Sequence, residues 1–214
     1  IPSEVGQLTA LEIFTIASNQ LTGNIPNEVG QLNALEICSF KSNQLGGIIP
    51  DEVGQLTALE ILSLHSNQLT GTIPVEVGQL TALVQLFLCS NQLTGTIPGE
   101  MGQLTALETL CLNFNHLTGI IPSTVGHLEN AAELKLQDNY LVGKIPSEMS
   151  KMRKLRTLFL QNNLLTGHVD DFFNQTTQLE LTTIDISNNL LSGSLSAEMF
   201  LLPQLRVLSL SGAY

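Results

Sequence analysis

The strongest constraint on this chain is a repeat of 24 residues that runs through the sequence. Residues 54–74 read GQLTALEILSLHSNQLTGTIP, and residues 78–98 read GQLTALVQLFLCSNQLTGTIP. Asparagine recurs at positions 19, 43, 67, 91, 115, 139 and 163, and the next one, Asn189, follows 26 residues later. A period between about 20 and 50 residues is typical of solenoids, propellers and arrays. We therefore expect a single repeat domain over residues 1–214, with about nine turns and one longer turn near residues 164–189.

Each fixed letter of the repeat has a physical role. Counting back from each asparagine, positions −8, −5 and −3 are apolar, as in Leu59, Leu62 and Leu64. The −5 and −3 residues alternate with variable ones, which predicts one short strand per turn and a stacked parallel sheet. We expect the asparagine to satisfy backbone groups at the bend after the strand, and the glycine to need a positive φ. The proline marks the end of regular pairing, and the EVGQLTAL stretch is expected to return the chain as a 3₁₀ or helical turn.

The pattern LxxLxLxxNxLTGxIPxxxGxLxx closely resembles the plant-type subclass of leucine-rich repeats. One repeat carries it at Leu59, Leu62, Leu64, Asn67, Leu69, Thr70, Gly71, Ile73, Pro74, Gly78 and Leu80. The resemblance extends from end to end and weakens only after Val169. It implies a curved, right-handed α/β repeat solenoid, with a parallel β-sheet on the concave face and short 3₁₀ or helical turns on the convex face. Family members are mostly recognition modules: ectodomains of receptor kinases, receptor-like proteins, and inhibitors of secreted hydrolases.

The variable letters on the concave face are candidates for binding a partner. Positions −6, −4 and −2 of successive repeats lie side by side across a parallel sheet. Phe87 and Phe159 occupy position −4, on the exposed side of their strands, where an aromatic side chain can anchor a partner. β-branched residues at position −6 also simply suit a strand. We predict a partner-binding surface at these two phenylalanines and at Lys135, Cys111, Ile61 and His65.

The composition and charge exclude two classes of function. Hydrophobic residues make up 43% of the chain, enough for a continuous core, and the formal net charge of −11 argues against a general nucleic-acid binder. No apolar run approaches the roughly 20 residues that cross a bilayer. Residues 1–110 contain ten acids and one base, whereas residues 111–214 contain nine acids and seven bases. The bases gather in KMRKLR (151–156), near Lys135 one repeat earlier, as either an anionic-ligand or partner patch or a solvated face.

The cysteines and histidines form no recognisable active site. Cys38 is at the inward position −5 and is expected to be a small buried hydrophobe. Cys89 and Cys111 fall on adjacent strands but two positions apart, which puts their Cα atoms about 8 Å apart, beyond disulfide reach. Cys89 and His65 share the −2 row, yet no third orienting residue or ligand converges on them. We expect no enzyme, no catalytic residue, no metal and no cofactor.

The cellular compartment of the protein is predicted from its resemblance to plant-type leucine-rich repeats. Secreted plant-type arrays usually carry paired cysteines in terminal caps and several glycosylation sequons. This chain has no cap cysteines and a single sequon at Asn174, in the irregular insertion DDFFNQTTQ. Both ends look uncapped and the chain opens in the middle of a repeat, so we expect further segments or a partner to cover the ends. An extracellular or cell-surface protein glycosylated at Asn174 is expected, and the free thiols keep an intracellular alternative open.

Three functional hypotheses follow. The first is a non-catalytic scaffold that recognises a protein or peptide, as a fragment of a larger cell-surface or secreted protein. The second is a structural or assembly subunit whose partners are neighbouring subunits of a complex, since near-identical repeats leave few distinctive surface residues. The third is ice binding, which a flat row of threonines can support. Thr-x-Thr pairs occur in only two neighbouring repeats, at residues 70–72 and 94–96.

Overall fold

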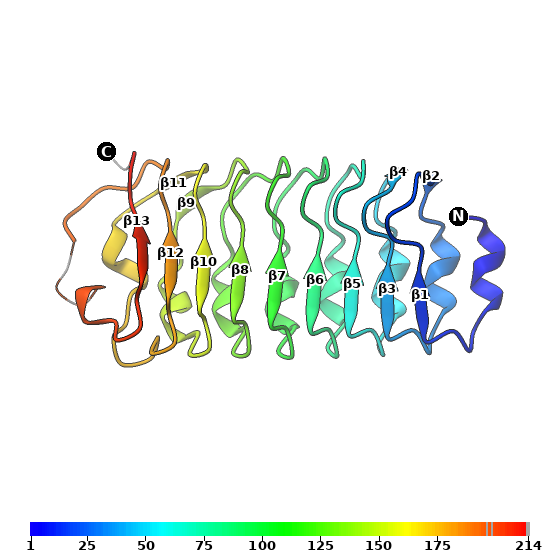
Figure 1. Ribbon diagram of the computed structural model, residues 1–214, viewed down its shortest axis with the longest axis horizontal. Coiled ribbons are helices and arrows are strands. Elements are labelled where there is room, and N and C mark those ends of the chain that lie inside the picture. The colour runs from blue at the N-terminus through cyan, green and yellow to red at the C-terminus, as the bar shows by residue number, and fades with distance from the viewer. Residues whose placement is uncertain (196, 198, 213–214) are drawn as a thin grey trace.

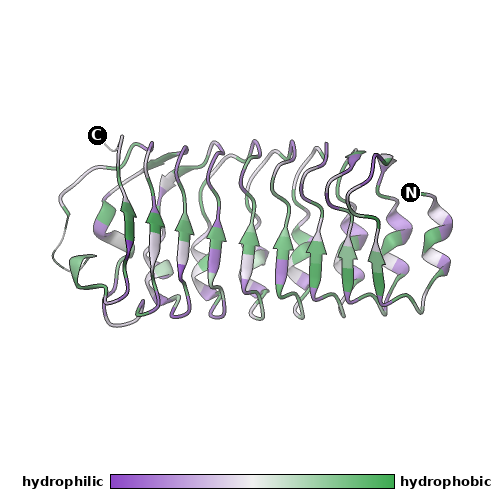
Figure 2. Ribbon diagram, in the orientation of Figure 1, coloured by the Kyte–Doolittle hydropathy of each residue, from purple (hydrophilic) through white to green (hydrophobic). Residues whose placement is uncertain are grey.

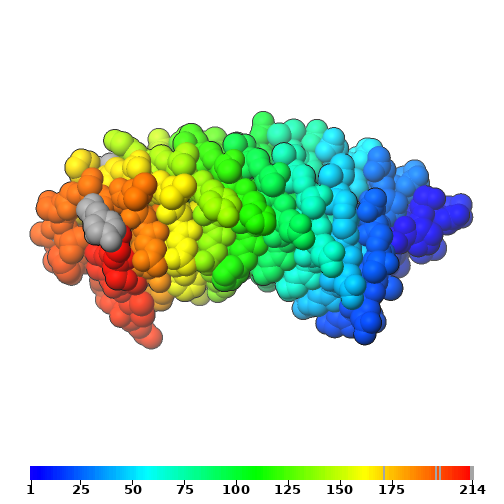
Figure 3. All heavy atoms as spheres, turned by 90° about the horizontal axis from the view of Figure 1, so that it is seen from above, coloured from blue at the N-terminus to red at the C-terminus, as the bar shows by residue number. Residues whose placement is uncertain are grey.

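The chain folds into a solenoid with strands along one side and 3₁₀ helices along the other. The computed structural model describes residues 1–195, 197 and 199–212, without the side chain of Asp171. Figure 1 shows the strands side by side in one layer, with the helices behind them and the two termini at opposite ends. Seen from above, both ends project beyond the middle on the strand side, so the strand face is concave (Figure 3).

In the described part of the chain, the main sheet has nine parallel strands in the order β1-β3-β5-β6-β7-β8-β10-β12-β13. Equal repeat positions pair directly, as in Leu62 with Leu86 and Leu86 with Leu110. Each strand is three residues long: β1 (Ile13–Thr15), β3 (Ile37–Ser39), β5 (Ile61–Ser63), β6 (Gln85–Phe87), β7 (Thr109–Cys111), β8 (Glu133–Lys135), β10 (Thr157–Phe159), β12 (Thr183–Asp185) and β13 (Val207–Ser209).

The alternation within each strand separates core from surface. The central residues of β5, β6 and β7 are at most 1% exposed, whereas Ile61 and Phe87 on the outer side are half-buried. Figure 2 shows β1, β3 and β5 hydrophobic over most of their length, and hydrophilic residues on β8. This confirms the predicted period-2 pattern and leaves the outer positions to set the character of the concave face.

Short 3₁₀ helices return the chain on the convex side, as the EVGQLTAL stretch predicts. A proline in extended conformation precedes most of them, and an inward valine or methionine is buried beneath each of those turns, as with Pro74 and Val77. The helices are η1 (Ser3–Gln7), η2 (Asn27–Gln31), η3 (Asp51–Gln55), η4 (Val75–Gln79), η5 (Gly99–Gln103), η6 (Ser123–His127), η7 (Ser147–Lys151), η8 (Val169–Phe172) and η9 (Met199–Leu201).

The LTGxIP segments pair locally at the top edge of the solenoid in Figure 1. Two small parallel sheets form there, β2 (Thr22–Asn24) with β4 (Gln44–Gly46), and β9 (Val142–Lys144) with β11 (Leu164–Thr166). The glycine of this segment has a positive φ in every repeat, for example 76° at Gly95. The side chain of Thr72 from the preceding turn lies over Gly95, 2.8 Å from where a Cβ would sit. This position therefore requires glycine for two separate reasons.

The repeated asparagine ties each turn to the one before it. Asn115 Oδ1 accepts the backbone N–H of Leu93 at 3.0 Å, and its Nδ2 donates to the carbonyl oxygens of Leu88 and Leu112 at 3.1 and 3.0 Å. The same arrangement recurs at Asn43, Asn67, Asn91, Asn139, Asn163 and Asn189. The amide thus satisfies backbone groups that the bend leaves unpaired, as expected.

The longer turn keeps the core closed with different residues. Phe172 and Phe173 are buried, with ring centroids 4.2 Å apart, where η8 replaces the regular helix. Gln178, with no exposed surface, donates to Met149 O at 3.1 Å and accepts the Asn174 N–H at 2.9 Å. A buried amide therefore fastens the insertion to the preceding turn.

None of the helices in the described part of the chain is long and apolar enough to cross a membrane.

Candidate functional site

Four of the predicted contact residues form one continuous row on the concave face. Phe87 pairs with Cys111, Cys111 with Lys135, and Lys135 with Phe159, on the adjacent strands β6, β7, β8 and β10. We call Phe87, Cys111, Lys135 and Phe159 the concave strip. It presents half-buried aromatic rings at both ends and a cation between them.

The N-terminal end of the strip contains an aromatic pair. The rings of His65 and Phe87 meet edge to face, with centroids 5.7 Å apart. His65 Nδ1 also lies 3.1 Å from Ser63 Oγ, which orients the ring. Burial, together with the charge of Lys41, lowers the pKa of His65, so its neutral form is favoured. Ile61, at the −6 position, is half-buried and pairs with Gln85 on the next strand.

The centre of the strip carries an ion pair. Lys135 Nζ lies 2.7 Å from Glu133 Oε2, on the same strand and the same face. The hydrogen bond to this carboxylate raises the pKa of Lys135. Since both side chains are about a third exposed, a partner can reach the cation and the carboxylate together.

The two central cysteines influence each other's ionisation. The Cys111 thiol hydrogen-bonds with Cys89 and also lies 3.0 Å from Asn113 Oδ1. The hydrogen bond between the two thiols lowers the pKa of Cys89 and raises the pKa of Cys111. Both remain free thiols, and burial raises the pKa of the third, Cys38, to about 12.

Cys111 does not fit the role of a contact residue. Its side chain is only 7% exposed, because Cys89, Asn113 and the flanking strip residues surround it. A partner would reach Phe87, Lys135 and Phe159 but gain little area from Cys111. The strip therefore has three accessible side chains, which stay candidate contact residues, and one largely buried thiol.

Two glutamines in the −2 row were not singled out from the sequence. Gln137 Oε1 and Gln161 Oε1 are buried and have no hydrogen-bond partner among the described residues. Each lies two residues after the end of a strand, Gln137 after Lys135 and Gln161 after Phe159. Unsatisfied buried acceptors are rare in folded proteins and need an explanation such as a bound donor. The only signal in the sequence is that they extend the row of His65 and Cys89.

The basic residues of 151–156 are divided between the two sides of their turn, and Lys135 lies on one of these sides. Lys135 lies on the concave strand β8, whereas Lys151 ends helix η7 on the convex side. Arg156 is paired with Glu180 at 2.8 Å. The expected proximity to Lys135 does not hold for Lys151, which lies on the helical side of its turn. Arg156, by contrast, directly precedes β10, the strand next to β8.

The sequon lies in the insertion, where a turn forms around Asn174. Its Oδ1 accepts the Thr176 backbone N–H at 2.9 Å and the Thr176 hydroxyl at 2.6 Å, and the Asn174 side chain is half-exposed. Glycosylation here stays a prediction. In the described residues, no group of three or more His, Cys, Asp or Glu side chains is placed to hold a metal ion.

These features define a parallel β-solenoid with one strand per turn and a concave recognition face. Leucine rich repeat family models match residues 105–165 and, separately, residues 58–80, 82–104 and 180–202. The chain belongs to the leucine-rich-repeat family, and its repeats are of the plant type.

Solved structures place the chain close to plant receptor ectodomains. It is 32% identical to PEPR1, solved with AtPEP1, over 98% of this chain and 30% of that one, with a TM-score of 0.94. It is 33% identical to the ectodomain of the Arabidopsis receptor kinase HAESA, solved with an IDA peptide hormone, over 98% of this chain and 35% of that one (TM-score 0.91). A plant ice-binding protein is 33% identical over 99% of this chain and 67% of that one (TM-score 0.86).

The chain therefore spans about a third of the receptor ectodomains it resembles. A search of curated protein sequences finds no match.

Proposed function

We propose that this chain is a non-catalytic recognition module that binds a peptide or protein segment along its concave face. The observation that carries the proposal is the concave strip, in which Phe87, Lys135 and Phe159 lie in one row on β6, β8 and β10, with Cys111 on β7 between the first two. The receptors PEPR1 and HAESA, which share its fold and a third of its sequence, were solved with peptide ligands.

The chemistry of the strip suits an extended segment with apolar and acidic side chains. The two phenylalanines offer half-buried rings as anchors for apolar groups, and aromatic anchors commonly dominate binding energy. Lys135 can pair with a carboxylate while Glu133 accepts a backbone N–H. The unpartnered oxygens of Gln137 and Gln161 lie in the neighbouring row and can accept hydrogen bonds if a ligand reorients these amides.

The module is proposed to belong to a larger cell-surface or secreted protein. This placement is supported by the receptor ectodomains to which the chain is similar and by the sequon in the exposed insertion. Mass analysis of the protein from its native source tests it. A glycan on Asn174 is expected, and an unmodified Asn174 with no extra mass beyond this chain would contradict it.

The binding proposal is tested by selecting peptides on the full chain from a displayed random library. Phe87→Ala and Phe159→Ala are each expected to weaken the selected peptides about tenfold, since a buried aromatic anchor contributes 1–3 kcal/mol, roughly. Tyr140→Ala and Phe200→Ala remove exposed aromatic rings away from the strip and serve as controls. Equal affinity for all four variants would rule out the concave strip as the binding surface.

Ice binding is a second candidate, favoured by the likeness to the plant ice-binding protein. The Thr70, Thr94 and Thr118 hydroxyls donate to carbonyl oxygens of the preceding turn, which fixes their rotamers in a row. The exposed Ile48 and Ile120 interrupt the parallel row that contains Thr72. Thermal hysteresis of the purified chain decides the question, and its absence would eliminate this candidate.

A further inference from the structure

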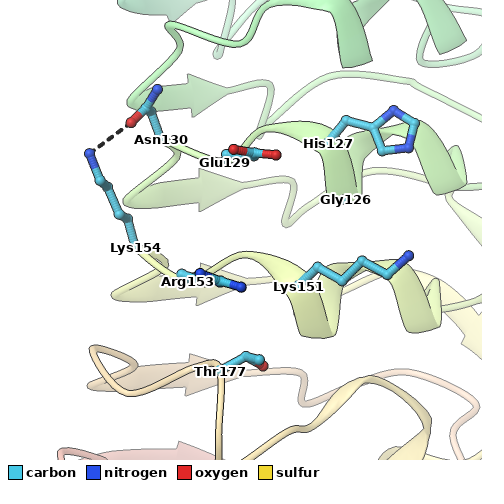
Figure 4. A pocket seen from close by; sticks show the side chains of 8 residues that line it. All are labelled: Gly126, His127, Glu129, Asn130, Lys151, Arg153, Lys154 and Thr177. Carbon is cyan, nitrogen blue, oxygen red and sulfur yellow. Dashed lines mark hydrogen bonds between the residues drawn. The ribbon is translucent and has the colours of Figure 1, made fainter.

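A groove lies between the sixth and seventh turns, away from the concave strip. Its volume is about 500 Å³, within the range of small-ligand sites. His127, Glu129 and Asn130 line it from one turn, and Lys151, Arg153 and Lys154 line it from the next (Figure 4). We call these six residues the basic groove. Gly126 and Thr177 complete its lining.

The basic groove departs from the surface that the other turns repeat. In the first five turns the three equivalent positions are Gln, Thr or Asn, and Ala, as in Gln103, Thr105 and Ala106. In the sixth turn they become His, Glu and Asn, and in the seventh they become Lys, Arg and Lys. Five turns of this chain therefore form their return segment with uncharged residues at all three positions. Basic side chains at all three positions occur in the seventh turn alone, and the eighth turn has Thr177, Leu179 and Glu180 there.

Among the described residues, no carboxylate forms an ion pair with the cations of the groove. Asn130 Nδ2 donates to Thr105 O at 2.7 Å, and its Oδ1 accepts Lys154 Nζ at 2.7 Å, which positions Lys154 at one end. Among the described residues, the side chains of Lys151 and Arg153 have no hydrogen-bond or ion-pair partner, unlike that of Lys154. Arg156, by contrast, is paired with Glu180. Three cations within four residues create a local positive field on a chain of net charge −11.

The mixture of charges limits the ligand chemistry. Lysine and arginine donors bind phosphate and sulfate oxygens with short, charge-assisted hydrogen bonds. Glu129 repels a ligand that is anionic along its whole length, but its carboxylate accepts hydrogen bonds from hydroxyl groups. In Figure 4 Arg153 lies between Lys154 and Lys151, so anionic groups at both ends of a ligand meet a cation.

We propose that the basic groove binds a small polyol that carries two or more phosphate or sulfate ester groups. The ester oxygens pair with Lys151, Arg153 and Lys154, and the free hydroxyl groups donate to Glu129. This site is separate from the concave strip, so it does not depend on the peptide-binding function.

The test is calorimetric titration of the full chain with inositol hexakisphosphate and with sucrose octasulfate. Inorganic phosphate and unsubstituted inositol are titrated alongside. The groove variant Lys151→Gln/Arg153→Thr/Lys154→Ala carries the residues of the regular turns, which already fold at these positions. The control variant Lys41→Gln/Lys144→Thr/Arg206→Thr removes the same amount of charge elsewhere, also with residues that sister turns use.

Binding of at least one polyol ester is expected, weakened about tenfold or more in the groove variant and by less than about twofold in the control. If the groove variant has a lower unfolding midpoint, Arg153→Thr alone replaces it and should still weaken binding.

Absence of binding would overturn the proposal, and so would equal weakening in the groove and control variants, which indicates attraction to general charge. Equal affinity for inorganic phosphate would overturn the polyol assignment. Selection of peptides on the concave strip is measured separately, so either proposal can fail alone.

Discussion

The regular turns and the seventh turn differ at the position of the 3₁₀ helix that packs against the next turn. Gly102 in the fifth turn lies against the next turn so closely that a Cβ would sit 2.5 Å from Thr124 O. Gly78 and Gly126 are equally tight against the helices that follow them. In the seventh turn the same position is Ser150, which is half-exposed and faces the insertion rather than a regular helix.

This difference shows where the array is constrained and where it is free. In the regular turns each helix packs directly on the next one. This close stacking requires the helix glycine, the asparagine and the inward leucines at fixed positions of every turn. The two-residue insertion ends that stacking after the seventh turn. The sixth and seventh turns also carry the basic groove. The basic groove, whose residues differ from those of the regular turns, therefore lies next to the insertion, where the regular stacking of helices ends.

The largest expected effect concerns the asparagine inside the stack. Asn115→Ala removes an acceptor and donor that bond three backbone groups, at a residue only 5% exposed. We expect a loss of about 3 kcal/mol in the free energy of unfolding, because buried backbone groups lose their partners. Chemical denaturation measures it. Asn19→Ala is the control, since Asn19 is exposed and, in the described chain, its side chain bonds only to Ile16 O and Ala17 O of its own turn. Equal losses would contradict stacking between turns as the source.

The next effect tests the close contact of the helices. Gly102→Ala should cost about 2 kcal/mol, because the added methyl group meets backbone atoms that cannot yield without separating two turns. Ser150→Ala should change the free energy of unfolding by less than about 0.5 kcal/mol. Denaturation curves of the two variants are compared with that of the parent. A tolerated Gly102→Ala would show that the turns are not packed as tightly as their geometry indicates.

The thiols give a smaller effect that depends on pH. Alkylation requires the thiolate, whose fraction rises as pH rises through the pKa, so a lowered pKa keeps Cys89 reactive at lower pH. Cys89 is expected to react at least about tenfold faster than the buried Cys38, whose pKa is about 12. Mass spectrometry after iodoacetamide treatment at several pH values measures both.

Cys111→Ala provides the control for the thiol prediction. It removes the hydrogen bond to the Cys89 thiolate, so the pKa of Cys89 should rise and its rate curve should move to higher pH. An unmoved curve would contradict the hydrogen bond as the cause.

The smallest effect lies at the exposed ion pair beyond the groove. Glu180→Gln breaks the pair with Arg156, whose side chains are 40% and 64% exposed. We expect a loss of about 0.5 kcal/mol or less, since solvent and salt screen such pairs. Denaturation in low and high salt checks this, and the difference from the parent should shrink as salt is added. A loss as large as that of Asn115→Ala would mean that surface charges, rather than stacking, stabilise the seventh turn.

The sequence by itself determined the repeat and the role of each fixed letter. The period of 24 residues predicts one strand per turn, the Leu62 and Leu64 positions predict the core, and the glycine at 95 predicts a positive φ. These features depend on backbone hydrogen bonding and on the stacking of identical units. A pattern within one turn is therefore enough to predict them.

Only the tertiary structure decided which variable side chains meet. It placed Cys111 under the concave face, brought its thiol to Cys89, and separated Lys135 from the groove cations. These outcomes depend on rotamers, on the curvature of the sheet, and on which side of the turn a residue lies. None of these is encoded in the spacing of letters, because each results from the packing of one turn against its neighbours.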